Sequence, residues 1–302
     1  MRLALCSLVS LSRGGMAALQ SAPRRALWVD TDAGFDDLLA LGALSRDAAL
    51  EVVTVGSGAC ETPLDGARRV ARFLGALGRS DVRVVAGAPA PRVDVAPWLV
   101  TARRKMIEWC SEHLPADGPG LAVDESVETA VAKVAPRACL CLGPLGNVAE
   151  ALPAAPSLER VVVMGGNRLD DVSPEFNLAC DPAAAAEVFA RAPGLELVGL
   201  DVCDADLLSP VGEDLGMRCA ASTATRARLL GSLCATDAYA AVCDPVAAFA
   251  LIDVGGVEAA SATVVVDDAG VLRAEDGGRP ARVARGLDAA AYAAWLEGAI
   301  IF

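Results

Sequence analysis

Short apolar runs alternate with segments of helical spacing along most of the 302-residue chain. The apolar runs predict buried strands over residues 26–32, 50–57, 81–87, 136–143, 160–166 and 195–202. Helical spacing predicts helices between them, over residues 35–45, 64–78, 147–152 and 181–192. Strands that alternate with helices form a parallel sheet with helices on both faces. The pattern therefore predicts an open α/β fold, Rossmann-like, with a mainly parallel central sheet.

The remainder of the chain fits the same domain. Residues 211–256 are predicted to be mostly helical, followed by two strands (261–268 and 281–287) and a helix (289–299). Because there is no long linker and no internal repeat, residues 26–302 are predicted to form one domain. Residues 1–25 contain four arginines and no acid, which is typical of a weak targeting or secretory segment or of a non-native start.

Charge and cysteine usage narrow the class of partner. The chain has 26 basic and 39 acidic residues, a net charge of −13, which disfavours nucleic acid and anionic membranes as partners. No apolar run reaches 18 residues, so no membrane-spanning helix is expected. Ten cysteines without CxxC spacing favour a reducing compartment such as the cytoplasm. With His113 as the only histidine, a histidine triad or multi-histidine metal site is hard to build.

Four aspartates lie within eight residues, directly after the first predicted strand. They are Asp30, Asp32, Asp36 and Asp37, and Gly34 between them is expected to allow a sharp turn. Carboxylates packed this closely repel one another, and their oxygens suit Ca²⁺ or Mg²⁺. In the alternative interpretation, two of them cap the following helix and Asp30 is solvated. Ligand sites of open α/β sheets lie at the carboxyl ends of the strands, where this cluster is predicted.

The chain carries an ordered set of further motifs at predicted strand ends and helix starts. DTDAGFDD (30–37) is followed by GPLGN (143–147), MGGN (164–167), SPEFNLACDPAAA (173–185), GLDVCDADLLSP (199–210) and CDPVAAFALID (243–253). In residue type and order they resemble the inosine-uridine-preferring nucleoside hydrolase family. The resemblance implies a mainly parallel sheet wrapped by helices, hydrolysis of the N-glycosidic bond of ribonucleosides, and one Ca²⁺ deep in the pocket.

The resemblance also implies a ligand set for that Ca²⁺. Asp32, Asp37 and Asp244 would supply carboxylates, and the backbone carbonyl of Gly146 would supply a further oxygen. Asp32 would accept the proton of the attacking water, as a general base does. Relatives in the family form dimers or tetramers, so the resemblance implies a homodimer or homotetramer.

Four further residues would contact the ribose by the same resemblance. Asp36 would bind the 2′-hydroxyl, Glu175 and Asn177 other hydroxyls, and Asn167 the 5′-hydroxyl. Carboxylates near the sugar suit the chemistry, because glycosidic cleavage passes through an oxocarbenium-like state with positive charge on the ring. Taken alone, Glu175 and Asn177 could instead serve the loop that enters the next helix.

The chain departs from the family pattern at two places that concern the base and the ribose. Many members have His before the aspartate at 244, as a proton donor to the leaving base, whereas this chain has Cys243, as a subgroup of the family does. A thiol is a poorer acid near neutrality than imidazole, so we expect purine nucleosides such as inosine to be favoured. An Asn after the second strand is also missing, and Ser57 or backbone could replace its ribose contact.

Two aromatic residues, Trp98 and Trp109, flank a predicted amphipathic helix. Packing in the core is the favoured interpretation, and stacking on a purine is the alternative. Two other functions remain open from the sequence. Loss of the family His and Asn would suit a nucleoside- or ribose-binding relative without activity. The Asp-x-Asp after a strand also occurs in haloacid-dehalogenase-like phosphatases, but those need a downstream lysine and this chain has only Lys105 and Lys133.

Overall fold

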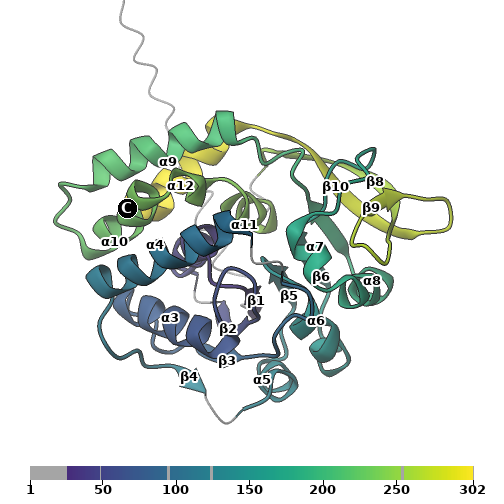
Figure 1. Ribbon diagram of the computed structural model, residues 1–302, viewed down its shortest axis with the longest axis horizontal. Coiled ribbons are helices and arrows are strands. Elements are labelled where there is room, and N and C mark those ends of the chain that lie inside the picture. Colours follow the sequence, from purple (N-terminus) through teal and green to yellow (C-terminus); the bar gives the residue numbers. More distant parts are fainter. Residues whose placement is uncertain (1–25, 48, 94–95, 123–124, 253–254, 302) are drawn as a thin grey trace, which may run out of the picture.

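The computed structural model describes residues 26–301 except 48, 94–95, 123–124 and 253–254. The predicted segment 1–25 lies outside the described residues. The described strands form one ten-stranded sheet in the order β4-β3-β2-β1-β5-β6-β7-β10-β8-β9 (Figure 1). Their bounds are β1 Leu27–Thr31, β2 Leu50–Val55, β3 Arg83–Ala86, β4 Leu121–Ala122, β5 Ala138–Cys141, β6 Arg160–Met164, β7 Leu195–Val198, β8 Val257–Val266, β9 Leu272–Ala274 and β10 Arg279–Leu287.

The pairing is parallel from β4 to β10 and antiparallel only where β8 pairs with β10 and β9. The chain first builds outward from β1 through β2, β3 and β4, and then returns to place β5 on the other side of β1. The strand order therefore reverses at β1 and β5, and such a switch point opens a crevice at the carboxyl ends of the strands. The mainly parallel α/β fold predicted from the sequence is confirmed.

Helices cover both faces of the sheet. Their bounds are α2 Phe35–Leu44, α3 Pro63–Ala76, α4 Pro97–His113, α5 Val127–Val134, α6 Gly146–Ala151, α7 Phe176–Cys180, α8 Pro182–Arg191, α9 Ala205–Cys219, α10 Thr225–Thr236, α11 Asp244–Ile252 and α12 Ala289–Ile301, with short 3₁₀ turns η1 Leu152–Ala154 and η2 Ala238–Ala241. One core joins a face of the sheet to α2, α3, α4 and α9 to α12, and a second core joins the other face to α5, α6 and α8.

Strand β1 lies in the middle of the sheet, and its first three residues, Leu27 to Val29, show why the strand begins apolar. Leu27 and Val29 face the larger core, whereas Trp28 faces the smaller one. Because successive side chains point to opposite faces, a strand covered on both sides needs no polar positions until it ends. The acids of the first motif begin at Asp30, which is still within β1 and fully buried, near the carboxyl end of the strand.

Most predicted elements are present within a few residues of their predicted bounds. The short strands β4 and β9 and the helices α5 and α7 were not predicted, because two to eight residues carry too little periodicity. Among the described residues, no single helix has both the length and the apolar composition to cross a membrane. The bent pair Thr225–Thr236 and Ala238–Ile252 meets that test jointly, by length and composition.

Candidate active site

A cavity of about 810 Å³ opens at the carboxyl edge of the sheet, beside the switch point. Most of its lining comes from the β1–α2 motif, the first half of α4, the ends of β5 and β6, the start of α7 and the η2–α11 segment, and Ala59, Arg69 and Leu200 complete it. The motifs DTDAGFDD, GPLGN and MGGN meet at this one edge, since β1, β5 and β6 are neighbours in parallel. The cavity has the size of a small-molecule site.

The turn between β1 and α2 is held by Asp37. Its carboxylate accepts hydrogen bonds from the Thr31 hydroxyl, from the Asp32 amide at 3.1 Å and from the Gly34 amide at 2.9 Å. The residue in the left-handed region is Ala33, with φ of 62°, whereas Gly34 is extended, so the expectation that Gly34 makes the sharp turn was wrong. A non-glycine residue with this φ is strained and persists only where its surroundings hold it.

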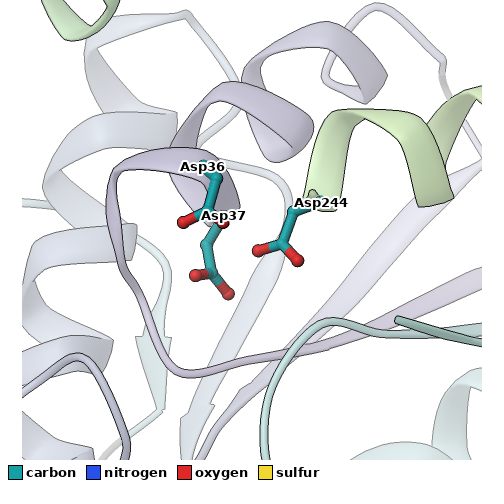
Figure 2. Close-up of side chains that lie close together, drawn as sticks. All are labelled: Asp36, Asp37 and Asp244. Atoms are coloured by element: carbon teal, nitrogen blue, oxygen red, sulfur yellow. The ribbon is translucent and has the colours of Figure 1, made fainter. Parts of the chain in front are cut away.

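Three carboxylates converge from two helices that are 200 residues apart in sequence (Figure 2). Asp36 and Asp37 lie in the first turn of α2 and Asp244 begins α11, and one oxygen of each lies within 4.8 Å of the others. Burial, with repulsion by Asp37, raises the pKa of Asp36 to about 8 and raises that of Asp244 well above its usual range. A cation would relieve this repulsion, and oxygen ligands of this kind suit a hard divalent metal ion.

Asp32 lies beside this cluster. One oxygen of its carboxylate accepts a hydrogen bond from the Ala59 amide at 2.8 Å, and burial and the charge of Asp37 raise its pKa. The loop after β2 can approach because residue 58 is glycine: a Cβ there would lie 2.0 Å from the Asp32 carboxylate oxygen. The same loop places Ser57 outside the cavity lining, where its hydroxyl accepts from the Ala90 amide at 2.7 Å.

Asp30 lies beneath the site and is fully buried rather than solvated. One of its carboxylate oxygens accepts from the Thr54 hydroxyl and from the Asn147 amide at 2.9 Å, while the other has no hydrogen-bond partner within the described part of the chain. Burial raises the pKa of this carboxyl to about 7. Asn147 also accepts from the Ala88 amide at 3.2 Å, so Asp30 and Asn147 tie the ends of β1, β2, β3 and β5 together below the cavity.

Glu175 and Asn177 line the cavity and are both 6% exposed. Glu175 caps α7 by accepting from the amides of Asn177 at 2.9 Å and Leu178 at 3.3 Å, and it also accepts from Gly166 at 3.1 Å. Asn177 donates to the carbonyl of Leu142 at 3.0 Å. Burial raises the pKa of Glu175. Both residues therefore order the strand ends, and their predicted contacts with ribose stay predictions.

Two predicted site residues are not among those that line the cavity. Gly146 is the first residue of α6, and its nearest neighbour toward the Cβ position is the Asp181 carboxylate. Asn167 donates to the carbonyl of Ser173 at 2.9 Å and so closes the loop between β6 and α7. The carbonyl ligand at Gly146 and the 5′-hydroxyl contact of Asn167 stay predictions.

Cys243 precedes Asp244 and lines the cavity, although only 4% of it is exposed. Its sulfur lies 3.1 Å from the hydroxyl of Tyr239, which is 44% exposed and also lines the cavity. A hydrogen bond with the Cys203 thiol, together with burial, raises the pKa of the Cys243 thiol. A buried thiol of this kind is a weak proton donor at neutral pH.

The two tryptophans of α4 have different environments. Trp109 is buried, packs against Phe35 and Phe73, and donates to the Ser232 hydroxyl at 2.9 Å, as the core-packing interpretation predicts. Trp98 is 57% exposed, lines the cavity and meets the Phe176 ring edge-to-face at 5.3 Å. For Trp98 the core-packing interpretation was wrong, because the first turn of α4 extends beyond the core to the cavity mouth.

Sequence reasoning missed several residues of the cavity lining. Tyr239, Phe176 and Lys105 line it, and so does Arg69, which is 6% exposed and donates to the Ala33 carbonyl at 2.8 Å. The signal for Tyr239 was available, since it lies four residues before Cys243 on a helical segment. The position of Arg69 had no such signal, because arginines within amphipathic helices are usually solvated. His113 ends α4 and is exposed.

The fold is an open α/β sheet with a carboxylate cluster at its switch point and aromatic side chains at the mouth of the cavity. This combination defines a class of α/β protein whose site could hold a metal ion and a small polar ligand that has an aromatic part. The family model described as inosine-uridine preferring nucleoside hydrolase matches residues 27–294. The chain belongs to this family.

Individual relatives agree with that assignment. The pyrimidine-specific ribonucleoside hydrolase RihA of Shewanella woodyi is 33% identical over 192 residues, which are 59% of this chain and 61% of that protein. The protein of the same name from Salmonella typhi is 33% identical over 195 residues, 58% of this chain and 60% of that protein. The chain thus matches about three fifths of the length of these curated relatives.

Solved structures share the fold over nearly the whole chain. A plant nucleoside hydrolase, PpNRh1, has a TM-score of 0.73 at 20% identity and covers 93% of this chain and 100% of that one. The inosine-uridine preferring nucleoside hydrolase from Bacillus anthracis has a TM-score of 0.72 at 16% identity and covers 91% and 99%. At these identities the likeness shows a common fold.

Proposed function

We propose that this chain hydrolyses the N-glycosidic bond of ribonucleosides to ribose and free base in a Ca²⁺-dependent reaction. The observation that carries the proposal is the group of three carboxylates from Asp36, Asp37 and Asp244 at the bottom of the cavity. Membership of the nucleoside hydrolase family supports the same reaction over the phosphatase alternative. When bound, a divalent cation would supply positive charge that holds ribose hydroxyls and acidifies a water molecule.

The sequence-derived and structural ligand sets share two residues. Asp37 and Asp244 belong to both, while the resemblance adds Asp32 and the geometry adds Asp36. Asp32 remains a candidate because its carboxylate adjoins that of Asp37. Calcium titration calorimetry of Asp32→Asn and Asp36→Asn discriminates the two assignments, since the variant that lacks a ligand binds Ca²⁺ more weakly.

The protein groups around the cluster suit the rest of the chemistry. Asp32 has one oxygen held by the Ala59 amide and its carboxylate beside that of Asp37, so it could receive the proton of the attacking water. Glu175 is buried at the side of the cavity and, with Asp36, would face a ribose that gains positive charge as the bond breaks. In this proposal Asn177 holds a ribose hydroxyl by its remaining amide oxygen.

We infer that purine nucleosides, inosine among them, are the preferred substrates. The mouth of the cavity presents Trp98, Phe176 and Tyr239, and a larger base covers more of such aromatic surface. The relatives named above are pyrimidine-specific by name, but they match over only part of their length. Equal kcat/KM for inosine and uridine would contradict this preference.

Release of hypoxanthine from inosine tests the proposed function. Purified protein should release hypoxanthine and ribose in equal amounts with Ca²⁺, and a chelator should abolish the release. Asp32→Asn should remove most of the activity, with Asp170→Asn as a control because Asp170 lies on an exposed loop outside the cavity. Binding of inosine without release, measured by calorimetry, would instead support a nucleoside-binding protein without activity.

Two further properties belong to the same proposal. We propose a homodimer or homotetramer, which light scattering on the purified protein tests. We also propose a cytoplasmic location, supported by nine described cysteines that are all buried and that form no disulfide within the described residues. Fractionation of the native cells tests that location.

A further inference from the structure

The hydroxyl group of Tyr239 lies in the cavity mouth, outside the carboxylate cluster. Tyr239 belongs to the short turn η2 directly before Cys243, is 44% exposed, and lines the cavity. Its hydroxyl oxygen lies 3.1 Å from the Cys243 sulfur, and either atom can be the donor. When the thiol donates, the phenol proton is free to point into the cavity. The ring of Tyr239 is therefore exposed to a ligand while its hydroxyl is oriented from behind.

The position of Tyr239 is fixed from two sides. Asp237 caps η2 by accepting from the Tyr239 amide at 3.1 Å. Across the mouth, the ammonium group of Lys105 on α4 lies 3.7 Å from the Asp237 carboxylate. Cys243 itself is 4% exposed and has the Cys203 thiol as a second partner. Of the two groups in contact, the phenol is thus the one that can reach a bound base.

We propose that Tyr239 donates the hydrogen bond that helps the nucleobase leave, and that Cys243 is a positioning residue that orients this hydroxyl. The inference rests on the proposed function and assigns its leaving-group step. Asp244, which follows Cys243, ties the sugar end of the cavity to the same segment. A purine bound with its ribose over the carboxylates would extend toward Tyr239 and present a ring nitrogen to it.

The step balances without a further reactant. The bond between C1′ and the base nitrogen breaks and its electron pair stays with the base, while the water oxygen bonds to C1′. The proton of that water passes to the Asp32 carboxylate, and the departing base takes up one proton from solvent. Tyr239 stabilises the negative charge that develops on the base and keeps its own proton, because the ordinary pKa of a phenol is about 10.

Two substrates with different leaving groups test the inference. Hypoxanthine leaves poorly without a hydrogen-bond donor, whereas p-nitrophenolate leaves p-nitrophenyl riboside unaided. Tyr239→Phe should lower kcat for inosine by about 10²-fold and change kcat for p-nitrophenyl riboside less than about threefold. Cys243→Ala should lower kcat for inosine less than Tyr239→Phe does, and Cys243→Ser, which can still orient the phenol, should recover most of that loss.

The possible outcomes separate this inference from the proposed function. Unchanged inosine hydrolysis in Tyr239→Phe overturns the role of Tyr239, and so does an equal loss on both substrates, which indicates a structural effect. Cys243→Ser behaving like Cys243→Ala overturns the positioning role of Cys243. If the wild-type protein cleaves neither substrate, the proposed function fails and this inference fails with it. Thermal unfolding of each variant shows whether it is folded.

Discussion

The two ends of the cavity are built in opposite ways. The inner end consists of buried carboxylates at the starts of α2 and α11, with hydrogen bonds from backbone amides to Asp32 and Asp37. The outer end consists of partly exposed rings, among them Trp98 and Tyr239, on the first turn of α4 and on a short 3₁₀ turn. The inner end depends on exact placement of charge, whereas the outer end offers apolar surface that tolerates adjustment.

The two ends should therefore differ in how strongly a small displacement changes activity. Repulsion between carboxylates is strong in a buried site, so displacing one carboxylate by about one ångström at the inner end should lower kcat strongly. Stacking on an aromatic ring is worth much less and depends weakly on angle. Catalysis should therefore fail steeply at the inner end, and substrate affinity should change gradually at the outer end.

The largest expected effect is the loss of a carboxylate from the cluster. Asp244→Asn removes one of three carboxylates that meet within 4.8 Å, and we expect kcat for inosine to fall by about 10³-fold or more, with weaker Ca²⁺ binding. Hypoxanthine release and calcium titration calorimetry measure both. Asp214→Asn, on the exposed side of α9, is the matched control, and an equal loss there would contradict the special role of Asp244.

A smaller but still large loss of kcat is expected when Gly58→Ala adds one methyl group beside Asp32. In Gly58→Ala the new Cβ would lie 2.0 Å from the Asp32 carboxylate oxygen, so either the loop or the acid must move. A shift of this size predicts a loss of about 10²-fold in kcat. Gly255→Ala, where a Cβ meets nothing within 4 Å but φ is 80°, controls for glycine replacement. Full activity of the Gly58 variant would show that Asp32 need not be placed so strictly.

The two tryptophans of α4 provide a direct test of the comparison. Trp98→Ala should raise KM for inosine by about tenfold with little change in kcat, because it removes stacking surface at the mouth. Trp109→Ala should lower the free energy of unfolding by about 3–5 kcal/mol, because Trp109 is 2% exposed in the core. Kinetics and chemical denaturation distinguish them. Ile107→Ala, exposed on the same helix outside the cavity, should change neither KM nor kcat.

The smallest effect is expected for the ion pair across the mouth. Lys105→Met removes the partner of Asp237, which caps the turn that carries Tyr239. Both groups are partly exposed, so the pair contributes little energy, and we expect a two- to threefold loss in kcat/KM that high salt also produces in the wild type. A loss of more than about tenfold would show that the mouth is held as strictly as the metal end.

Much of this contrast could be predicted from the sequence, and the rest could not. The first motif has its acids within eight consecutive residues, so the inner end was predicted from a local pattern, together with Asp244 by resemblance. Trp98 and Tyr239 lie 141 positions apart and share no local pattern, so only the packing of α4 near η2 brings both to one cavity. The helix-capping role of Asp37 and the loop role of Glu175 were alternatives in the sequence, and only the positions of the backbone amides in the structure show both.

By itself, the sequence determined the alternation of strands and helices, the parallel sheet and the acidic carboxyl edge, because each depends on neighbours within a few residues. The tertiary structure alone decided which carboxylates meet, with Asp36 beside Asp37 and Asp244, and which aromatic side chain reaches the cavity. These outcomes depend on distances between segments far apart in the chain. Such distances are set by the packing of helices on the sheet, and no local preference encodes them.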